Sequence, residues 1–172
     1  FFQEPGKAEA DLEADIHKTM RGFLYVISGD ALRNGDINEP FDGHFPAGEA
    51  MTDQLVSPEE LPLWLTEEDL HFYVDEITRT GFRGGLNWYR NINRLPAITA
   101  PFLGSTINQP SFYMGGSTDL IAGNTPEAIS SMQQALGDLR HCEIIEGAGH
   151  WLQQECSSEV SSAMVNFLEG LD

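Results

Sequence analysis

The chain has 172 residues, with 9 Lys and Arg against 27 Asp and Glu, 41% hydrophobic residues and two cysteines. This composition is typical of a globular protein, and the length is a soft prior for one domain. The formal net charge of −18 argues against binding to phosphate backbones, which depends on clustered Lys and Arg. We therefore expect no nucleic acid as a partner. Because no apolar run reaches the roughly 20 residues of a spanning helix, we expect no membrane as a partner either.

Helical patterns fill the first part of the chain. Apolar positions between Lys7 and Ser28 recur at three- and four-residue steps, which predicts one amphipathic helix that ends at Gly29 and Asp30. The following residues, to about Ser57, are rich in Gly, Pro, Asn and Asp. They indicate a long loop.

Two further helices have recognisable ends. One is predicted to begin after Thr66, because Thr66 and Asp69 have the spacing of a capping box, and to end at Gly81. A short helix is expected over residues 84–93. Leu95-Pro96 should then close the helical region.

Two short apolar runs in the second half predict buried strands. They span 111–114 and 142–145, and each is followed by glycine within a few residues. A helical pattern follows each run, over 126–136 and 160–168. The order strand, helix, strand, helix implies the end of a parallel α/β sheet, so we expect further strands before Phe1.

An acidic residue and a histidine follow these two strands. Asp119 comes just after the first strand, and His150 comes just after the second, between Gly149 and Trp151. Because ligands collect at the carboxyl ends of parallel strands, the two side chains should approach each other. The order acid, then histidine, is the tail of the α/β-hydrolase triad, in which the acid holds the imidazole in one tautomer. The alternative for Asp119 is an ordinary turn residue.

A nucleophile is not recognisable in the sequence. No Gly-X-Ser-X-Gly elbow occurs, and neither Ser117 nor the two cysteines, Cys142 and Cys156, stand in such a frame. The cysteines lack CxxC spacing and are expected to be reduced, incidental thiols. The opening Phe1-Phe2 carries neither Met nor a targeting signal, so we expect the chain to begin inside a longer protein and the elbow to lie upstream.

Four longer stretches can be compared with known families: FFQEPGKAEADLEAD, LPLWLTEEDLHFYVDEITRTGFRGGLNWYRNI, GGSTDLI and EGAGHWLQQE. Together they resemble the soluble epoxide hydrolases of the α/β-hydrolase fold. GFRGGLNWYRN is highly specific, whereas GHW occurs across many α/β hydrolases. The resemblance implies a partial α/β-hydrolase fold, with a helical cap over residues 1–100 followed by the last strand-helix units of the parallel core sheet over residues 101–172.

The resemblance also implies roles for individual residues. In that family a core aspartate attacks an epoxide carbon, two cap tyrosines hydrogen-bond the epoxide oxygen, and a His-Asp pair activates the water that hydrolyses the ester. By motif position the second cap tyrosine is Tyr89, the charge-relay acid is Asp119 and the general base is His150. No cofactor is implied. The residues expected to line the substrate pocket are Trp151, Ile121 and Phe2.

A tyrosine suits the first chemical step. Opening an epoxide generates an alkoxide, and a phenol with the ordinary pKa of about 10 can donate a hydrogen bond to it while staying protonated at neutral pH. His150 would then activate water next to the ester, and Asp119 would stabilise the imidazolium that forms. The residues and the resemblance therefore agree on the chemistry.

Two other functions remain open from the sequence. A fluoroacetate-type dehalogenase resembles this family in its Asp-His-Asp chemistry, but a halide pocket replaces the tyrosine pair, so Tyr89 favours the epoxide. A non-catalytic binding fragment is compatible with the missing nucleophile. The family's nucleophile motif, oxyanion-hole motif and first cap tyrosine are all absent from this sequence.

The remaining polar and aromatic residues are expected to be structural. Four histidines lack ligand spacing with one another or with the cysteines, so we expect no metal site: His17, His44, His71 and His141. Three tyrosines are expected to be packing residues: Tyr25, Tyr73 and Tyr113.

The expected partners are a small epoxide, water and the missing N-terminal half of the same protein. A homodimer is compatible with the resemblance, and a cytoplasmic location is expected.

Overall fold

The computed structural model describes residues 4–45, 49–120 and 124–171 and divides into two compact units. The helical unit combines Phe1–Tyr25 with Phe45–Leu103, and the sheet unit combines Val26–His44 with Gly104–Asp172. Residues 26–44 therefore cluster with the later part of the chain. The division into a cap over 1–100 and a core part over 101–172 stays a prediction.

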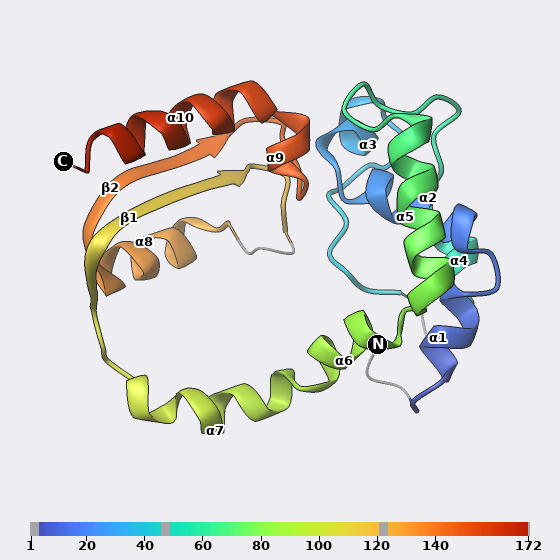
Figure 1. The fold of residues 1–172 in the computed structure, drawn as a ribbon, viewed down its shortest axis with the longest axis horizontal. Coiled ribbons are helices and arrows are strands. Elements are labelled where there is room, and N and C mark those ends of the chain that lie inside the picture. The colour runs from blue at the N-terminus through green and yellow to red at the C-terminus, as the bar shows by residue number, and fades with distance from the viewer. Residues whose placement is uncertain (1–3, 46–48, 121–123, 172) are drawn as a thin grey trace. The chain divides into compact units, whose positions relative to one another are not determined.

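The helical unit consists of helices joined by turns and loops (Figure 1). Its longest helix is α5, and α2 crosses from this unit into the sheet unit at its last residue. The elements are α1 (Lys7–Leu12), α2 (Ile16–Val26), α4 (Met51–Gln54), α5 (Glu67–Thr80), α6 (Arg83–Arg90), η1 (Ile92–Arg94), α7 (Leu95–Thr99) and η2 (Ala100–Phe102).

The helix predicted over residues 7–28 is wrong in one respect, because the chain breaks it into α1 and α2. The carboxylate of Asp15 accepts the N–H of Lys18 at 2.9 Å, as an N-cap residue does. The buried hydroxyl of Thr19 donates to the carbonyl of Leu12 at 2.8 Å. Side chains thus satisfy backbone groups at the break, and the apolar periodicity continues across it, which is why periodicity alone missed it.

Two predicted helix ends are helix beginnings. Gly29 and Asp30 open α3 (Gly29–Arg33), with Ser28 extended before them at φ −85° and ψ 161°. Leu95-Pro96 opens α7, because a proline in the first helical turn loses no intrahelical hydrogen bond. The loop expected up to Ser57 therefore contains α3 and also α4.

The capping box predicted at the start of α5 is confirmed. The N–H of Asp69 donates to Oγ1 of Thr66 at 3.1 Å, and the N–H of Thr66 donates to Oδ2 of Asp69 at 3.0 Å. At the other end Gly81 has a positive φ of 69°, which glycine adopts without strain. The helix predicted over residues 84–93 is confirmed as α6, followed by η1.

The sheet unit holds two parallel strands, β1 (Ile107–Gly116) and β2 (Leu136–Ile145). Both contain the predicted apolar runs and are longer than predicted. The connecting helix α8 (Pro126–Ala135) and the last helix α10 (Ser157–Glu169) flank the strand pair on opposite sides (Figure 1). This arrangement confirms a parallel α/β unit with strand-helix order.

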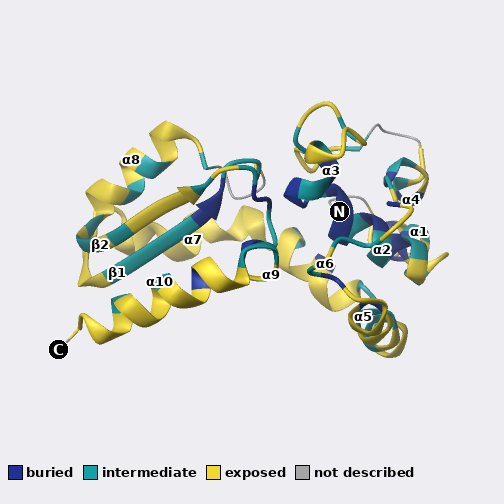
Figure 2. Ribbon diagram, turned by 90° about the horizontal axis from the view of Figure 1, so that it is seen from above, coloured by how far each residue is buried: buried dark blue, intermediate teal, exposed yellow. Residues whose placement is uncertain are grey.

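The buried part of the sheet unit lies where the strands end. Ala148, Leu152 and Val160 form an apolar cluster there, against which Met114 and Ile145 pack. Most strand residues before that point are exposed or half-buried (Figure 2). The carboxyl ends of the strands, together with the short helix α9 (Leu152–Glu155), are thus the best-packed region of this unit.

Candidate active site

The loops that follow β1 and β2 are bonded to each other. The N–H of Ser117 donates to the carbonyl of Ile145 at 3.0 Å, and the N–H of Gly147 donates to Oγ of Ser117 at 2.9 Å. Thr118 donates to the carbonyl of Ala148 both from its N–H, at 3.1 Å, and from its hydroxyl, at 2.8 Å. These bonds bring the residues after the two strands into one compact site.

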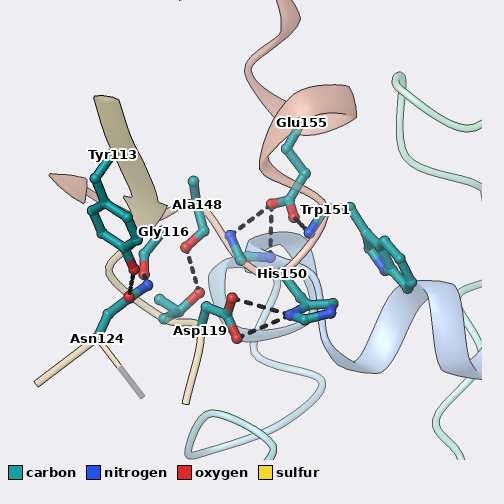
Figure 3. A network of polar contacts seen from close by, with 11 residues as sticks. Tyr113, Gly116, Asp119, Asn124, Ala148, His150, Trp151 and Glu155 are labelled. Atoms are coloured by element: carbon teal, nitrogen blue, oxygen red, sulfur yellow. Dashed lines mark hydrogen bonds and ion pairs between the residues drawn. The ribbon is translucent and has the colours of Figure 1, made fainter. Parts of the chain in front are cut away.

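Asp119 and His150 meet at that site. Nδ1 of His150 lies 3.1 Å from Oδ1 and 3.0 Å from Oδ2 of Asp119, so the carboxylate faces the ring nitrogen with both oxygens (Figure 3). Asp119 is buried, at 8% exposed, whereas a third of the His150 side chain is exposed. A neutral ring that donates from Nδ1 carries its lone pair on Nε2, which can then accept a proton. The contact predicted from the sequence is present.

The backbone of His150 is held from a distant segment. Its N–H donates to the carbonyl of Ile27 at 2.9 Å. A Cβ on Gly29 would lie 2.0 Å from the carbonyl oxygen of Gly147, and a Cβ on Gly149 would lie 2.5 Å from the nitrogen of Gly29. Only glycine therefore permits this approach of residues 27–29 to residues 147–151, the histidine loop.

Two polar residues near the site were not singled out in the sequence. Asn124 accepts a hydrogen bond from the hydroxyl of Tyr113 and donates from Nδ2 to the carbonyl of Gly116 at 3.0 Å. Glu155 accepts hydrogen bonds from backbone N–H groups on both sides of His150 (Figure 3). Of these two residues, only Glu155 had a signal in the sequence. It is the last residue of EGAGHWLQQE, one of the four stretches that resemble the epoxide hydrolases.

Burial shapes the environment of Tyr113. Desolvation raises the pKa of its phenol above the ordinary value, and the nearby charge of Asp119 raises it further. Tyr113 therefore stays protonated as the donor to Asn124 at neutral pH. Its partly buried position on β1 is consistent with the packing role predicted for it.

Tyr89 lies in the helical unit, on α6, with 42% of the residue exposed. The helix is anchored at three levels. At its start the N–H of Phe82 donates to Oε1 of Glu13 at 2.9 Å. In its middle Leu86 is buried with Ala8 and Leu12, and at its end Arg90 pairs with Glu9.

The predicted pocket-lining residues have different outcomes. The Trp151 ring lies edge-on to the His150 ring, with centroids 5.1 Å apart and planes at 76° (Figure 3). Ile121 and Phe2 lie outside the described residues. A hollow of about 410 Å³ lies between β2 and α10 instead, lined by His141 and Phe167 among others, and it does not include His150.

One set of side chains in the described residues has metal-ligand chemistry. Ligand atoms of His17, Glu67 and His71 lie within 4.8 Å of one another in the helical unit. Sequence spacing did not reveal this set, because His17 lies on α2 and the other two lie on α5. All three are exposed, and Glu67 is also paired with Arg21 at 3.2 Å. The geometry alone therefore does not select a metal ion.

Known proteins resemble the chain over its whole length. Epoxide hydrolase A of Mycobacterium tuberculosis (strain ATCC 25618 / H37Rv) is 40% identical over 172 residues, which cover 100% of this chain and 52% of that protein. Epoxide hydrolase 1 of Siraitia grosvenorii is 33% identical over 173 residues, which cover 98% of this chain and 51% of that protein. No protein-family model matches the sequence.

Solved structures point the same way. An epoxide hydrolase from an endophytic Streptomyces superposes with a TM-score of 0.88 at 37% identity, covering 99% of this chain and 51% of that one. Epoxide hydrolase A from Mycobacterium thermoresistibile gives a TM-score of 0.81 at 39% identity, with coverage of 99% and 51%. The chain is similar to the C-terminal part of epoxide hydrolases.

This similarity confirms the resemblance and the fold class predicted from the sequence. The chain spans about half the length of the curated relatives it matches. Its parallel strands and helices are part of an α/β-hydrolase fold. Among the residues that the structure describes, no helix is both long and apolar enough to cross a membrane.

Proposed function

We propose that the chain is the C-terminal part of an epoxide hydrolase that converts an apolar epoxide into a vicinal diol without a cofactor. The observation that carries the proposal is the contact of both carboxylate oxygens of Asp119 with Nδ1 of His150. The similarity to named epoxide hydrolases over the full chain supports epoxide hydrolysis as the reaction that this pair serves. In this proposal the missing half of the protein supplies the attacking aspartate.

The proposed reaction has two chemical steps. A carboxylate oxygen of the aspartate attacks an epoxide carbon, and the carbon–oxygen bond of the ring breaks. The electron pair moves to the epoxide oxygen, which receives a proton from a tyrosine, with Tyr89 as one donor. Water then gives a proton to Nε2 of His150 as its oxygen attacks the aspartyl ester, the ester bond breaks, and the diol leaves. The proton on the imidazolium returns to the tyrosinate, which restores both residues.

Asp119 supports the second step. It orients the imidazole through Nδ1 and stabilises the positive charge that the ring gains when it takes the proton. Trp151, edge-on to the ring, is proposed to line the substrate pocket with Ile121 and Phe2. A homodimer and a cytoplasmic location remain proposals from the sequence.

Trapping the ester tests this function. We expect a His150→Gln variant of the full-length protein to accumulate an adduct heavier by the mass of styrene oxide, because alkylation proceeds and hydrolysis does not. Wild-type protein should show the adduct only transiently. Intact-mass measurement after substrate addition decides, and a variant that forms no adduct would contradict the covalent mechanism.

Tyr89 separates the proposal from a fluoroacetate-type dehalogenase. A dehalogenase would release fluoride from fluoroacetate and would not depend on a phenol. We expect turnover of styrene oxide and no fluoride release. Fluoride release without epoxide turnover would indicate the dehalogenase. The absence of both reactions would indicate a non-catalytic protein.

A further inference from the structure

The carboxylate of Glu155 holds the peptide groups on either side of His150. Its Oε2 accepts the N–H of Gly149 at 2.9 Å, and its Oε1 accepts the N–H of Trp151 at 3.0 Å (Figure 3). The N–H of His150 itself donates to the carbonyl of Ile27 at 2.9 Å. Three successive N–H groups around the histidine are therefore fixed in direction.

A further bond ties the same carboxylate to a distant part of the chain. The N–H of Gly29 donates to Oε2 of Glu155 at 2.9 Å. Gly29 is also the residue whose backbone approaches Gly147 and Gly149 too closely for any Cβ. Glu155 thus lies at the junction of α9, the histidine loop and residues 27–29.

Capping of α9 does not account for this arrangement. Trp151 is the N-cap residue of that helix, so its bond to Glu155 resembles the backward bond of a capping box. The bonds from Gly29 and Gly149 come from outside the helix. A carboxylate can accept all three N–H groups, whereas the amide of a glutamine offers one oxygen and turns N–H donors toward N–H donors.

We propose that Glu155 is a positioning residue that keeps the His150 imidazole directed at Asp119. It acts through the backbone of the histidine loop, since its hydrogen bonds go to the peptide N–H groups of Gly29, Gly149 and Trp151 and not to the ring. The inference rests on the proposed function in that His150 is the base of the second chemical step. It predicts that loss of the carboxylate slows that step selectively.

The test uses the full-length protein and two matched variants. Glu155→Gln removes the charge and one acceptor, whereas Glu159→Gln makes the same change at an exposed position on α10. Single-turnover mass spectrometry with styrene oxide follows formation and loss of the ester. We expect Glu155→Gln to slow ester hydrolysis by about 10- to 100-fold and to leave the alkylation rate nearly unchanged. Glu159→Gln should match the wild type in both steps.

Other outcomes would overturn the inference. Equal slowing of both steps would indicate a general structural role, and unchanged hydrolysis would indicate no role. If Glu155→Gln does not fold, Glu155→Asp replaces it, because this variant keeps the charge and withdraws it by one methylene. It should then slow hydrolysis less than His150→Gln and still spare alkylation.

Proton NMR separates failure of this inference from failure of the proposed function. The Nδ1 proton shared by His150 and Asp119 should give a downfield signal in the wild type and in Glu159→Gln. In folded Glu155→Gln or Glu155→Asp we expect this signal to broaden or disappear. A retained signal contradicts the positioning role, even if the protein turns over no epoxide.

Discussion

Arg90 and Glu9 form a two-point ion pair that fastens α6 to α1. The distance from Nη1 to Oε1 is 2.7 Å, and the distance from Nη2 to Oε2 is 2.8 Å. Both side chains are largely buried, at 15% and 11% exposed. A planar guanidinium facing a carboxylate in this way restricts geometry more than a single contact does. Because Tyr89 directly precedes Arg90, the pair helps to fix the helix that carries the proposed proton donor.

The stability that Glu9 contributes to the fold should depend on pH. Its hydrogen bonds with Arg90 lower the pKa of this carboxyl from the ordinary 4.5 to about 2. A lowered pKa in the folded state contributes stability that is present above pH 4.5 and is lost as the pH falls toward 2. We expect Glu9→Gln to lower the midpoint of thermal unfolding at pH 7, and the difference from the wild type to close at about pH 2.

Glu76→Gln is the control for that experiment. Glu76 pairs with Arg79 on the exposed side of α5, and hydrogen bonding to Arg79 also lowers the pKa of Glu76. Exposed pairs of this kind contribute little to stability. Its unfolding midpoint should stay near the wild-type value, and an equal loss in both variants would show that burial of the Glu9 pair has no special effect.

Asp119→Asn should impair ester hydrolysis more than any stability loss explains. The amide turns either a weaker acceptor or an N–H donor toward Nδ1 of His150, so the ring is neither oriented nor stabilised when charged. We expect the hydrolysis rate to fall by about 10³- to 10⁴-fold. Single-turnover kinetics check this, with Asp138→Asn on β2 as the control, because Asp138 pairs with Arg140 away from the site.

Tyr89→Phe should act on the other chemical step. Without the phenol, one donor to the developing alkoxide is lost, and alkylation should slow by about 10²-fold while ester hydrolysis is retained. Tyr73→Phe on α5 is the control, since Tyr73 packs against Phe72 at 6.2 Å between ring centroids. The assigned role of Tyr89 is wrong if both variants alkylate at the wild-type rate.

Gly29→Ala should destabilise the junction of the histidine loop. Its Cβ would meet the carbonyl of Gly147 at 2.0 Å, which forces a backbone shift, and we expect a loss of about 1–3 kcal/mol in the free energy of unfolding. Gly84→Ala on α6 is the control, because its Cβ would have open space and alanine favours a helix. Denaturant unfolding measures both, and equal effects would contradict the packing account.

Local chemistry explains which elements were predictable. The Thr66 capping box and the Gly81 stop lie within a few residues of the helix they bound, so the sequence carries the whole signal. The apolar periodicity does not reveal the break between α1 and α2, because the bonds that stabilise it, from Thr19 to Leu12 and from Lys18 to Asp15, form only in the folded chain. The local sequence predicts a helix end at Gly29, because the partners that place it, Gly147 and Glu155, are far along the chain.

The sequence by itself determined the strand-helix order, the His-Asp pair and the similarity to epoxide hydrolases, because each is written in a short pattern or in an order along the chain. Only the tertiary structure decided that residues 27–29 support the histidine loop and that Glu155 joins them to it. It also decided that Glu9 fastens the helix of Tyr89. These contacts join residues far apart in sequence. Their geometry depends on the close approach of backbone segments and on which N–H donors the folded chain places next to the carboxylates of Glu9 and Glu155.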